Sequence, residues 1–251
     1  MKVISLNTWG GEAGLPKLLS FFRQHDDVDI FCLQEIWNGG EHMKTEKAGG
    51  SWLENRVTDL FPQLCEALPD HDSYFRPHFF DFYGLAMFVK KGITVHEEGE
   101  LFIYGERGFV SPDEMGNHSR NLQYVVVETE RGKKLVVNLH GLWNGRGKTD
   151  TEERLLQSEK IIELVNQHAL PSVILGDFNL LPTTMSVQKL EDAGLRNMIK
   201  ECGITSTRTS YYTKPEKFAD YAFVSDGVEV SEFKVLDDEV SDHSPLFIEF
   251  A

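Results

Sequence analysis

Residues with oxygen or imidazole side chains follow several short apolar runs of this 251-residue sequence. Asn7 follows Val-Ile-Ser-Leu, Glu35 comes shortly after Phe-Cys-Leu, and His140 follows Val-Val-Asn-Leu. Asp177 and Asn179 come shortly after Val-Ile-Leu. If these runs are aligned strands, the polar groups at their ends meet at one edge of a sheet.

The pair Asp242-His243, just before the apolar run 246–250, extends a set that contains no cysteine. Carboxylates, carboxamides and histidine suit a hard cation such as Mg²⁺ or Mn²⁺ better than structural zinc. Beside such a cation, a phosphate ester is the natural substrate. Taken singly, an Asp or Asn after a strand is more often a turn former or helix cap, and a lone histidine is usually structural.

The order of these residues along the chain carries more weight than any one of them. Six short pieces follow one another: Leu6-Asn7-Thr8-Trp9, Leu33-Gln34-Glu35, Asn138-Leu139-His140, Gly176-Asp177-Phe178-Asn179, Ala219-Asp220-Tyr221 and Ser241-Asp242-His243-Ser244-Pro245. Together they resemble the endonuclease/exonuclease/phosphatase superfamily, the deoxyribonuclease I-like metal-dependent phosphoesterases. The resemblance runs from Asn7 to the last strand, and six pieces in the family's order form a strong signal.

The resemblance implies an α/β fold of four layers. Two packed, mostly antiparallel sheets would lie between outer helices, with the active site at one edge. By the same resemblance Glu35 is the principal metal ligand, helped by Asn7 and Asp242, and the cofactor is Mg²⁺ or Mn²⁺.

The chemistry of phosphoester hydrolysis gives the other residues their expected roles. Asp177 would orient and deprotonate the attacking water, and Asn179 would offer its amide to water or phosphate. His243 would donate to a phosphate oxygen, while Asp220 would hold its tautomer and favour the imidazolium. A turn residue before the strand 221–224 is the alternative for Asp220. A second cation, if one binds, is expected near Asp177, Asn179 and His243, and the sequence leaves the number of ions open.

His140 resembles the histidine that contacts the scissile phosphate in deoxyribonuclease-like members. Those nucleases pair it with a glutamate on a strand that aligns with residues 82–88, where the matching position is Gly84. A close match to deoxyribonuclease I itself is therefore not expected. The Gly-Leu-Ala-Met-Phe-Val pattern looks more like members that act on nucleotide ends, lipids or small phosphoesters.

Substrate contacts are expected from residues close to these pieces. Trp9, Trp37 and Trp143 are predicted to wall the cleft and stack on a flat group, with packing under loops as the alternative. The glycine-spaced loop 144–148 supplies basic residues after the His140 strand, and a solvated turn is the alternative there. The predicted substrate-binding residues are Trp143, Asn144, Arg146 and Arg120, with Lys148, His118 and Arg208 as further candidates.

The elements that must position these residues are short strands alternating with helices. Apolar runs predict strands at 3–6, 28–33, 86–89, 124–128, 135–139, 173–175, 221–224 and 246–250. Several are apolar at consecutive positions, which is typical of sheets covered on both faces. Amphipathic patterns predict helices through Leu53 to Leu64 and through Leu155 to Val165, the second with Asp150 as N-cap and Glu153 three residues on. Segment 185–193 is predicted to end at Gly194, and stretches 37–50 and 104–121 are predicted to be long loops.

Composition narrows the setting in which such a site works. Residues 1–251 show no repeat or linker, which favours a single domain. The net charge of −15 disfavours broad binding to duplex nucleic acid but leaves a small local site open. Cys32, Cys65 and Cys202 lack the pattern of a disulfide framework or cysteine zinc cage. No apolar stretch is long enough for a membrane span or secretory signal, so we expect a cytoplasmic monomer with no protein partner.

The favoured interpretation is a divalent-metal-dependent hydrolase of a phosphodiester or phosphomonoester bond. A nuclease acting on single-stranded or end nucleotides is the alternative within this class. A member of the same fold that has lost catalysis and serves as a binding module is the alternative of another class. A serine hydrolase has weak support because no Gly-x-Ser-x-Gly motif occurs.

Overall fold

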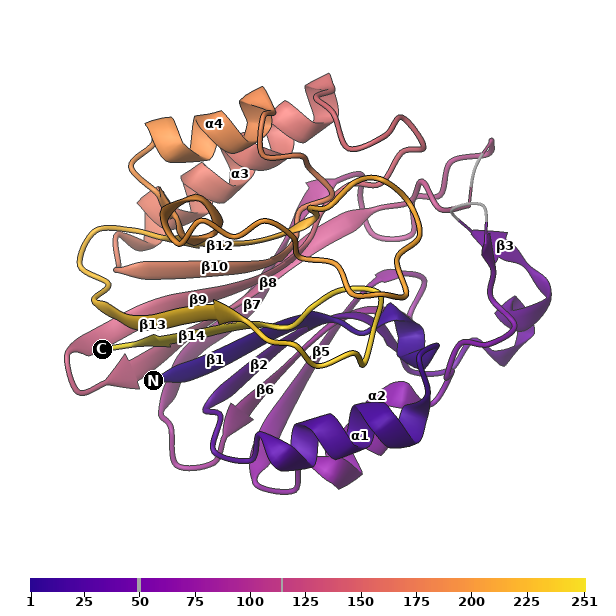
Figure 1. The fold of residues 1–251 in the computed structure, drawn as a ribbon, viewed down its shortest axis with the longest axis horizontal. Coiled ribbons are helices and arrows are strands. Elements are labelled where there is room, and N and C mark those ends of the chain that lie inside the picture. Colours follow the sequence, from indigo (N-terminus) through magenta and orange to yellow (C-terminus); the bar gives the residue numbers. More distant parts are fainter. Residues whose placement is uncertain (49–50, 114) are drawn as a thin grey trace.

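The computed structural model describes residues 1–48, 51–113 and 115–251. Two six-stranded sheets pack face to face, and helices cover their outer faces, so the molecule has four layers (Figure 1). The pairing is antiparallel except for one parallel pair in the middle of each sheet. The predicted four-layer α/β sandwich with mostly antiparallel sheets is confirmed.

The first sheet has the order β13-β14-β1-β2-β6-β5, and the second has the order β11-β12-β10-β9-β8-β7. The strands of the first sheet are β1 (Lys2–Asn7), β2 (Ile30–Trp37), β5 (His71–Phe79), β6 (Tyr83–Lys90), β13 (Val230–Val235) and β14 (Leu246–Phe250). Those of the second are β7 (Val95–Tyr104), β8 (Arg120–Thr129), β9 (Gly132–His140), β10 (Ser172–Asp177), β11 (Arg196–Asn197) and β12 (Asp220–Val224). A small hairpin consists of β3 (Lys47–Ala48) and β4 (Ser51–Trp52).

The helices form the two outer layers. On the first sheet lie α1 (Leu15–Gln24) and α2 (Leu60–Ala67), and on the second lie α3 (Glu152–His168) and α4 (Met185–Asp192) (Figure 1). The short elements are α5 (Met198–Glu201) and the 3₁₀ helices η1 (Trp9–Gly11) and η2 (Glu41–Thr45). None of the described helices is both long enough and apolar enough to span a membrane.

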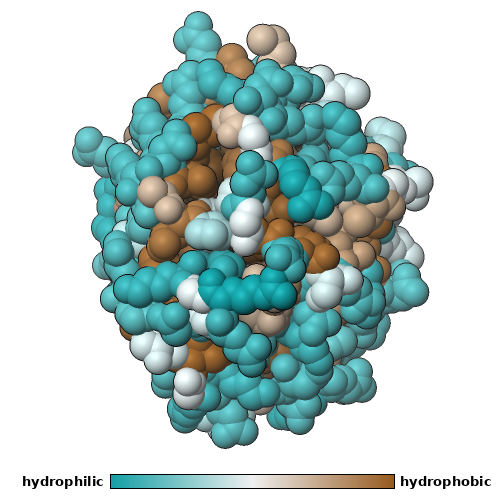
Figure 2. Space-filling view, turned by 90° about the vertical axis from the view of Figure 1, so that its left-hand side faces the viewer, coloured by the Kyte–Doolittle hydropathy of each residue, from teal (hydrophilic) through white to brown (hydrophobic). Residues whose placement is uncertain are grey.

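The apolar runs are continuous because both faces of each sheet are buried. In β2, Ile30 and Cys32 join the core between the sheets, whereas Phe31 and Leu33 point to the helix layer of α1 and α2. This alternation follows from the two-residue period of a strand. Both chain ends lie at one end of the sandwich (Figure 1). The surface at this end is mostly hydrophilic, with apolar residues scattered among the hydrophilic ones (Figure 2).

All eight predicted strands are present, but some longer elements had no predicted counterpart. Strands β5, β7 and β13 lie at sheet edges and carry many charged, partly exposed residues, which obscure the apolar pattern. Helix α1 was also missed. Helix α2 begins at Leu60, so Leu53 and Val57 precede it rather than belonging to it.

The predicted start of α3 is wrong by one residue. Thr151 is its N-cap, because the Thr151 hydroxyl accepts the Arg154 backbone N–H. The carboxylate of Asp150 instead accepts the backbone N–H groups of Met185 and Ser186, which lie at the start of α4.

The remaining predictions for helices and loops have mixed outcomes. The fully buried face of α3 is partly polar, because Arg154, Gln157 and Ser158 share it with Ile161 and Leu164. Helix α4 ends just before Gly194, as predicted. Long connections precede β3 and β8, while the Gly49-Gly50 part of the first predicted loop lies outside the described residues.

Candidate active site

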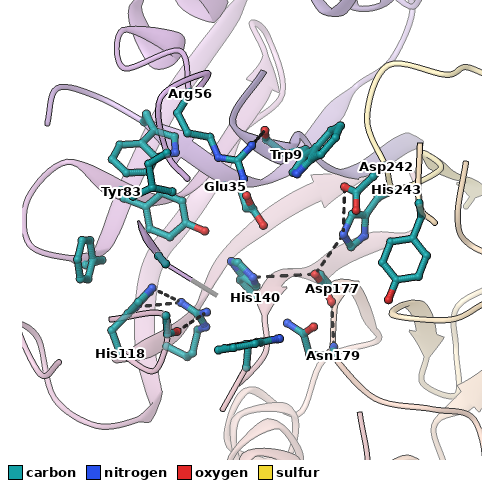
Figure 3. Close-up of a pocket in the computed structure, with 18 of the residues that line it drawn as sticks. Trp9, Glu35, Arg56, Tyr83, His118, His140, Asp177, Asn179, Asp242 and His243 are labelled. Carbon is teal, nitrogen blue, oxygen red and sulfur yellow. Dashed lines mark hydrogen bonds and ion pairs between the residues drawn. The ribbon is translucent and has the colours of Figure 1, made fainter. Parts of the chain in front are cut away.

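The parallel pair at the centre of each sheet delivers polar residues to one edge of the sandwich. In the first sheet Asn7 is the last residue of β1, and Glu35 lies near the end of β2. In the second sheet His140 and Asp177 end β9 and β10 and pair with each other in register. Asp220 begins β12 opposite Asp177. Glu35, His140 and Asp177 therefore line one cleft (Figure 3), and Asn7 and Asp220 contact the lining residues Asp177 and His243.

Three residues of the cleft have a strained backbone. Trp9, Glu35 and Asn179 have φ values of 51°, 59° and 54°, in the left-handed region that residues other than glycine rarely adopt. At Glu35 the pairing of β2 with β6 shifts register, which turns this side chain into the cleft. The Asn7 and Asp177 side chains hold the backbone N–H groups of Trp9 and Asn179 at 3.0 and 2.9 Å. Such strain costs about 1–3 kcal/mol per residue and clusters at functional sites.

Asn7 is buried behind the cleft and links the two sheets. Its Nδ2 donates to Glu35 Oε1 at 3.2 Å and to Asp177 Oδ2 at 3.0 Å. Burial and the neighbouring Asp242 carboxylate raise the pKa of Glu35 to about 7. An anionic Glu35 therefore lacks sufficient positive charge around it.

In the described part of the chain, Asp242 has a hydrogen-bond partner at only one of its two carboxylate oxygens. Its Oδ2 accepts a hydrogen bond from Arg208 at 3.1 Å, whereas its buried Oδ1 has no hydrogen-bond partner among the described residues. Oxygen ligands from two carboxylates and an amide fit Mg²⁺ or Mn²⁺. Glu35, Asp242 and Asn7 thus form a donor set that a divalent cation would satisfy.

A second buried cluster consists of Asp177, Asp220 and His243, whose potential ligand atoms lie within 4.8 Å of one another. Here hydrogen bonds already connect the groups: His243 Nδ1 lies 2.8 and 2.9 Å from the two oxygens of Asp220. His243 Nε2 lies 3.7 Å from Asp177 Oδ2. His243 is thus an imidazole held by a carboxylate, and a second cation near Asp177, Asn179 and His243 stays a prediction.

In this cluster the carboxylates favour the charged form of His243, and the nearby cations favour the charged form of Asp177. Burial and Arg208 lower the pKa of His243, but the carboxylates of Asp220, Asp242 and Asp177 outweigh them, so the pKa is raised overall. Burial raises the pKa of Asp177, but His243, His140, Lys148 and Arg208 hold it well below its usual range. Asp177 is therefore an ionised carboxylate near neutral pH.

His140 has a different environment, although its Nε2 lies 4.0 Å from the same Asp177 oxygen. Its buried Nδ1 lacks a hydrogen-bond partner in the described part of the chain. Burial and the nearby Arg120 lower the pKa of His140 to about 3. No acid can take the position of Gly84 without a shift of the backbone, because a Cβ there would lie 2.3 Å from the Arg76 carbonyl oxygen.

Two of the four predicted substrate-binding residues, Trp143 and Arg120, line the cleft. Trp9, Trp37 and His118 also line it, together with Lys148 and Arg208. Trp37 also stacks on Phe82 at 5.8 Å, so part of its role is packing.

Two predicted residues of the loop 144–148 are placed elsewhere. Arg146 is exposed, and Asn144 Oδ1 accepts the backbone N–H of Arg146, so these two form a solvated turn outside the described lining. Lys148, at the end of the same loop, faces the cleft instead. The glycine spacing reveals a turn but not which cation turns inward.

Sequence analysis did not identify Arg56, Tyr83 and Tyr212, which also line the cleft. Arg56 pairs with Glu12 and donates to the Trp9 carbonyl oxygen at 2.9 Å. The Tyr212 ring lies 4.0 Å from the guanidinium carbon of Arg208. None of the three belongs to a motif, so only the tertiary structure brings them to the site.

A four-layer sandwich that gathers polar strand ends at one edge is the deoxyribonuclease I-like fold. A model of the endonuclease/exonuclease/phosphatase family matches residues 4–243, and the chain belongs to this family of hydrolytic phosphoesterases. No curated protein sequence matched the chain.

Solved structures share the fold at low sequence identity. An endonuclease/exonuclease/phosphatase family protein from Bacteroides thetaiotaomicron is 21% identical, with a TM-score of 0.73 over 100% of this chain and 97% of its own. A mannosyl-6-phosphatase from the same organism is 21% identical, with a TM-score of 0.71 over 100% and 99%. Humanized D. rerio TDP2 is 15% identical, with a TM-score of 0.72 over 100% and 98%.

Proposed function

We propose that residues 1–251 form one domain that hydrolyses a phosphodiester or phosphomonoester bond with the help of Mg²⁺ or Mn²⁺. The observation that carries this proposal is the donor set of Glu35, Asp242 and Asn7. Burial and Asp242 raise the pKa of Glu35, and Asp242 Oδ1 has no hydrogen-bond partner among the described residues, although Arg208 pairs with Oδ2. Membership of a phosphoesterase family and the likeness of the fold to a mannosyl-6-phosphatase support the reaction class.

The cation would be held by Glu35, Asp242 and Asn7. When bound, it polarises the phosphoryl group and offsets the charge that develops on its oxygens. The strained backbone of Glu35 aims this carboxylate into the cleft rather than along the sheet.

Asp177 is the residue that accepts a proton from the attacking water. Asn7 Nδ2 and the Asn179 backbone N–H fix the carboxylate from two sides. Its low pKa keeps it ionised, so it is ready to accept a hydrogen bond from water across the neutral pH range. The Asn179 side chain beside it is placed to donate to water or to a phosphoryl oxygen.

His243 donates from Nε2 to a phosphoryl oxygen. Asp220 binds the Nδ1 side of the ring, which fixes the orientation of the imidazole and supports its charged form. Thr207 Oγ1 donates to Asp220 at 3.1 Å and holds this carboxylate in turn. His140, with its lowered pKa, offers a neutral imidazole on the other side of Asp177.

The test compares wild type, Glu35→Gln and a matched control, Glu54→Gln, in which the replaced side chain is exposed. We expect wild type and Glu54→Gln to hydrolyse p-nitrophenyl phosphate or bis-p-nitrophenyl phosphate with Mg²⁺ and to lose the activity in EDTA. Glu35→Gln should lower the rate by about a hundredfold or more and weaken Mg²⁺ binding in calorimetry. Equal rates for Glu35→Gln and wild type, or activity that survives EDTA, would contradict the proposal. Mg²⁺ binding without turnover of any phosphoester would favour a binding module.

A further inference from the structure

Two buried cations face the cleft without a carboxylate partner among the described residues. Arg120 is 4% exposed, and its hydrogen bonds reach the carbonyl oxygens of Gly141 and Gly116 and the rings of His118 and His78. All of these acceptors are neutral, because burial and Arg120 itself keep the pKa of both rings well below the usual value. Arg120 is therefore a fixed positive charge on the wall of the cleft.

Lys148 is the second such cation. It is 8% exposed, and its Nζ donates to the Phe218 carbonyl oxygen at 3.3 Å. Its ammonium group also lies 5.5 Å from the centre of the Tyr212 ring. Burial and the nearby Arg208 lower the pKa of Lys148 to about 8, as expected for a cation that lacks an adjacent anion.

Burial of an unpaired cation is costly unless a ligand supplies the opposite charge. The other cations of the cleft have partners or are exposed: Arg56 pairs with Glu12, Arg208 pairs with Asp242, and Lys214 is exposed. Arg120 and Lys148 are therefore the two cations with which a bound anion would form the most favourable electrostatic interactions.

The negative and positive charges of the described cleft residues can be compared in number. The three carboxylates that line the cleft, Glu35, Asp177 and Asp242, are matched by Arg208 and a divalent cation. The fourth carboxylate, Asp220, accepts a hydrogen bond from Thr207 Oγ1 and lies 2.8 Å from His243 Nδ1. Arg120 and Lys148 have no carboxylate partner in the part of the chain that the structure describes, and two such positive charges suit a ligand with two negative charges.

The two cations lie on opposite sides of the proposed proton acceptor. Arg120 Nε and Asn179 Nδ2 both donate to the Gly141 carbonyl oxygen, at 3.1 and 3.3 Å, at the end of β9. Lys148 is anchored at Phe218, just before β12. Strand β10, which ends in Asp177, lies between β9 and β12. A phosphate beside Asp177 can therefore be held from both sides.

We propose, on the basis of the phosphoesterase function above, that the substrate is a phosphomonoester and that Arg120 and Lys148 recognise its terminal phosphate as a dianion. A terminal phosphate carries about 1.5 to 2 negative charges at neutral pH, whereas a diester carries one. The cleft volume of about 210 Å³ suits a compact ester.

The reaction is balanced without a further reactant. The water oxygen bonds to phosphorus, the bond from phosphorus to the ester oxygen breaks, and inorganic phosphate and an alcohol are released. Asp177 takes one proton from the water and releases it to solvent after the reaction, and the leaving oxygen takes up one proton from solvent, so the proton count is unchanged.

The experiment uses two substrates that differ by one charge, p-nitrophenyl phosphate and methyl p-nitrophenyl phosphate, with Mg²⁺ at about pH 7.5. We expect Lys148→Met and Arg120→Met to lower kcat/KM for the monoester about tenfold to a hundredfold more than for the diester. Arg120→Lys keeps the charge and should retain most of the preference. Lys133→Met removes an exposed cation of β9 that is not part of the cleft lining and should change neither substrate markedly.

A binding measurement gives a second readout. Calorimetry with inorganic phosphate and with dimethyl phosphate should show that Lys148→Met weakens binding of the dianion alone, with thermal unfolding used to confirm that the variant is folded. Equal losses for both esters and both ligands would overturn the inference while leaving the phosphoesterase function intact. If the wild type hydrolyses neither ester, the proposed function fails, and the calorimetric comparison still decides whether these residues select a dianion.

Discussion

Two histidines flank Asp177 at similar distances but in opposite electrostatic environments. His243 Nε2 lies 3.7 Å from Asp177 Oδ2, and His140 Nε2 lies 4.0 Å from the same oxygen. The Asp220 carboxylate holds the far side of His243, whereas His140 has Arg120 nearby. One imidazole therefore favours its charged form and the other stays neutral.

The difference teaches that the neighbour of a strand-end histidine, rather than its position, decides its chemistry. In deoxyribonuclease-like nucleases a glutamate pairs with the histidine that His140 resembles, but here the matching position is Gly84, packed against the Arg76 carbonyl oxygen. His118 and Arg120 form the wall near His140, and the buried His78 packs against His118 and His140. Arg120 gives this side of the cleft a positive charge, which suits an anion.

The largest effect should follow from removing the carboxylate that both histidines share. Asp177→Asn keeps the shape of the side chain but abolishes its capacity to accept the proton of water. We expect kcat to fall about 10³-fold or more. Asp226→Asn, an exposed substitution, is the control, and a loss below about tenfold would argue against Asp177 as the proton acceptor.

A smaller loss should follow from Asp220→Asn, which affects only the His243 side. Because the Asp220 carboxylate raises the pKa of His243, its removal lowers that pKa. The charged imidazole is then lost at lower pH, so the alkaline limb of the kcat profile should move toward acid and kcat should fall about a hundredfold. An unchanged pH profile would show that His243 does not act as a cation.

The close packing of Gly84 against the neighbouring strand can be tested by measuring the stability of the protein. Gly84→Ala places a Cβ 2.3 Å from the Arg76 carbonyl oxygen and 2.5 Å from Pro77 Cα, so the two strands must move apart. We expect a loss of about 1–3 kcal/mol in the free energy of unfolding, measured by urea denaturation. Gly92→Ala, which meets nothing within 4 Å but has a positive φ, should cost less. Equal costs would mean that the close approach at Gly84 is unimportant.

The smallest effect is expected in the titration of the His140 and His243 rings, which NMR can measure in metal-free protein. His140 should stay neutral down to about pH 3, and His243 should titrate above its usual pKa. In Arg120→Met the pKa of His140 should rise, because a repelling charge is gone, yet stay below the ordinary value, because the ring is still buried. An unchanged pKa of His140 in Arg120→Met would show that Arg120 does not influence this ring.

The sequence was sufficient to predict the inner strands of the fold and the residues at their ends. Strands buried on both faces, such as β2 and β10, have continuous apolar runs, and the ordered motifs place Asn7, Glu35 and Asp177 after them. Edge strands such as β7 and β13 were missed because one face is exposed and charged.

The walls of the cleft could not be predicted in the same way. Arg56 and Tyr83 reach the site through packing between distant segments, and no local pattern marks them. In the loop 144–148 the spacing suggested Arg146, but the turn exposes Arg146 and directs Lys148 inward. The opposite pKa shifts of His140 and His243 also depend on neighbours that only the fold brings together.

The central claim is that Glu35 and Asp242, from distant parts of the chain, hold one divalent cation. Anomalous diffraction from a crystal soaked in Mn²⁺ tests it most directly. We expect a manganese peak at about 2.0–2.2 Å from an oxygen of each carboxylate, with Asn7 beside it. A peak held by Asp220 and His243 alone, or no peak within about 4 Å of Glu35, would contradict the account.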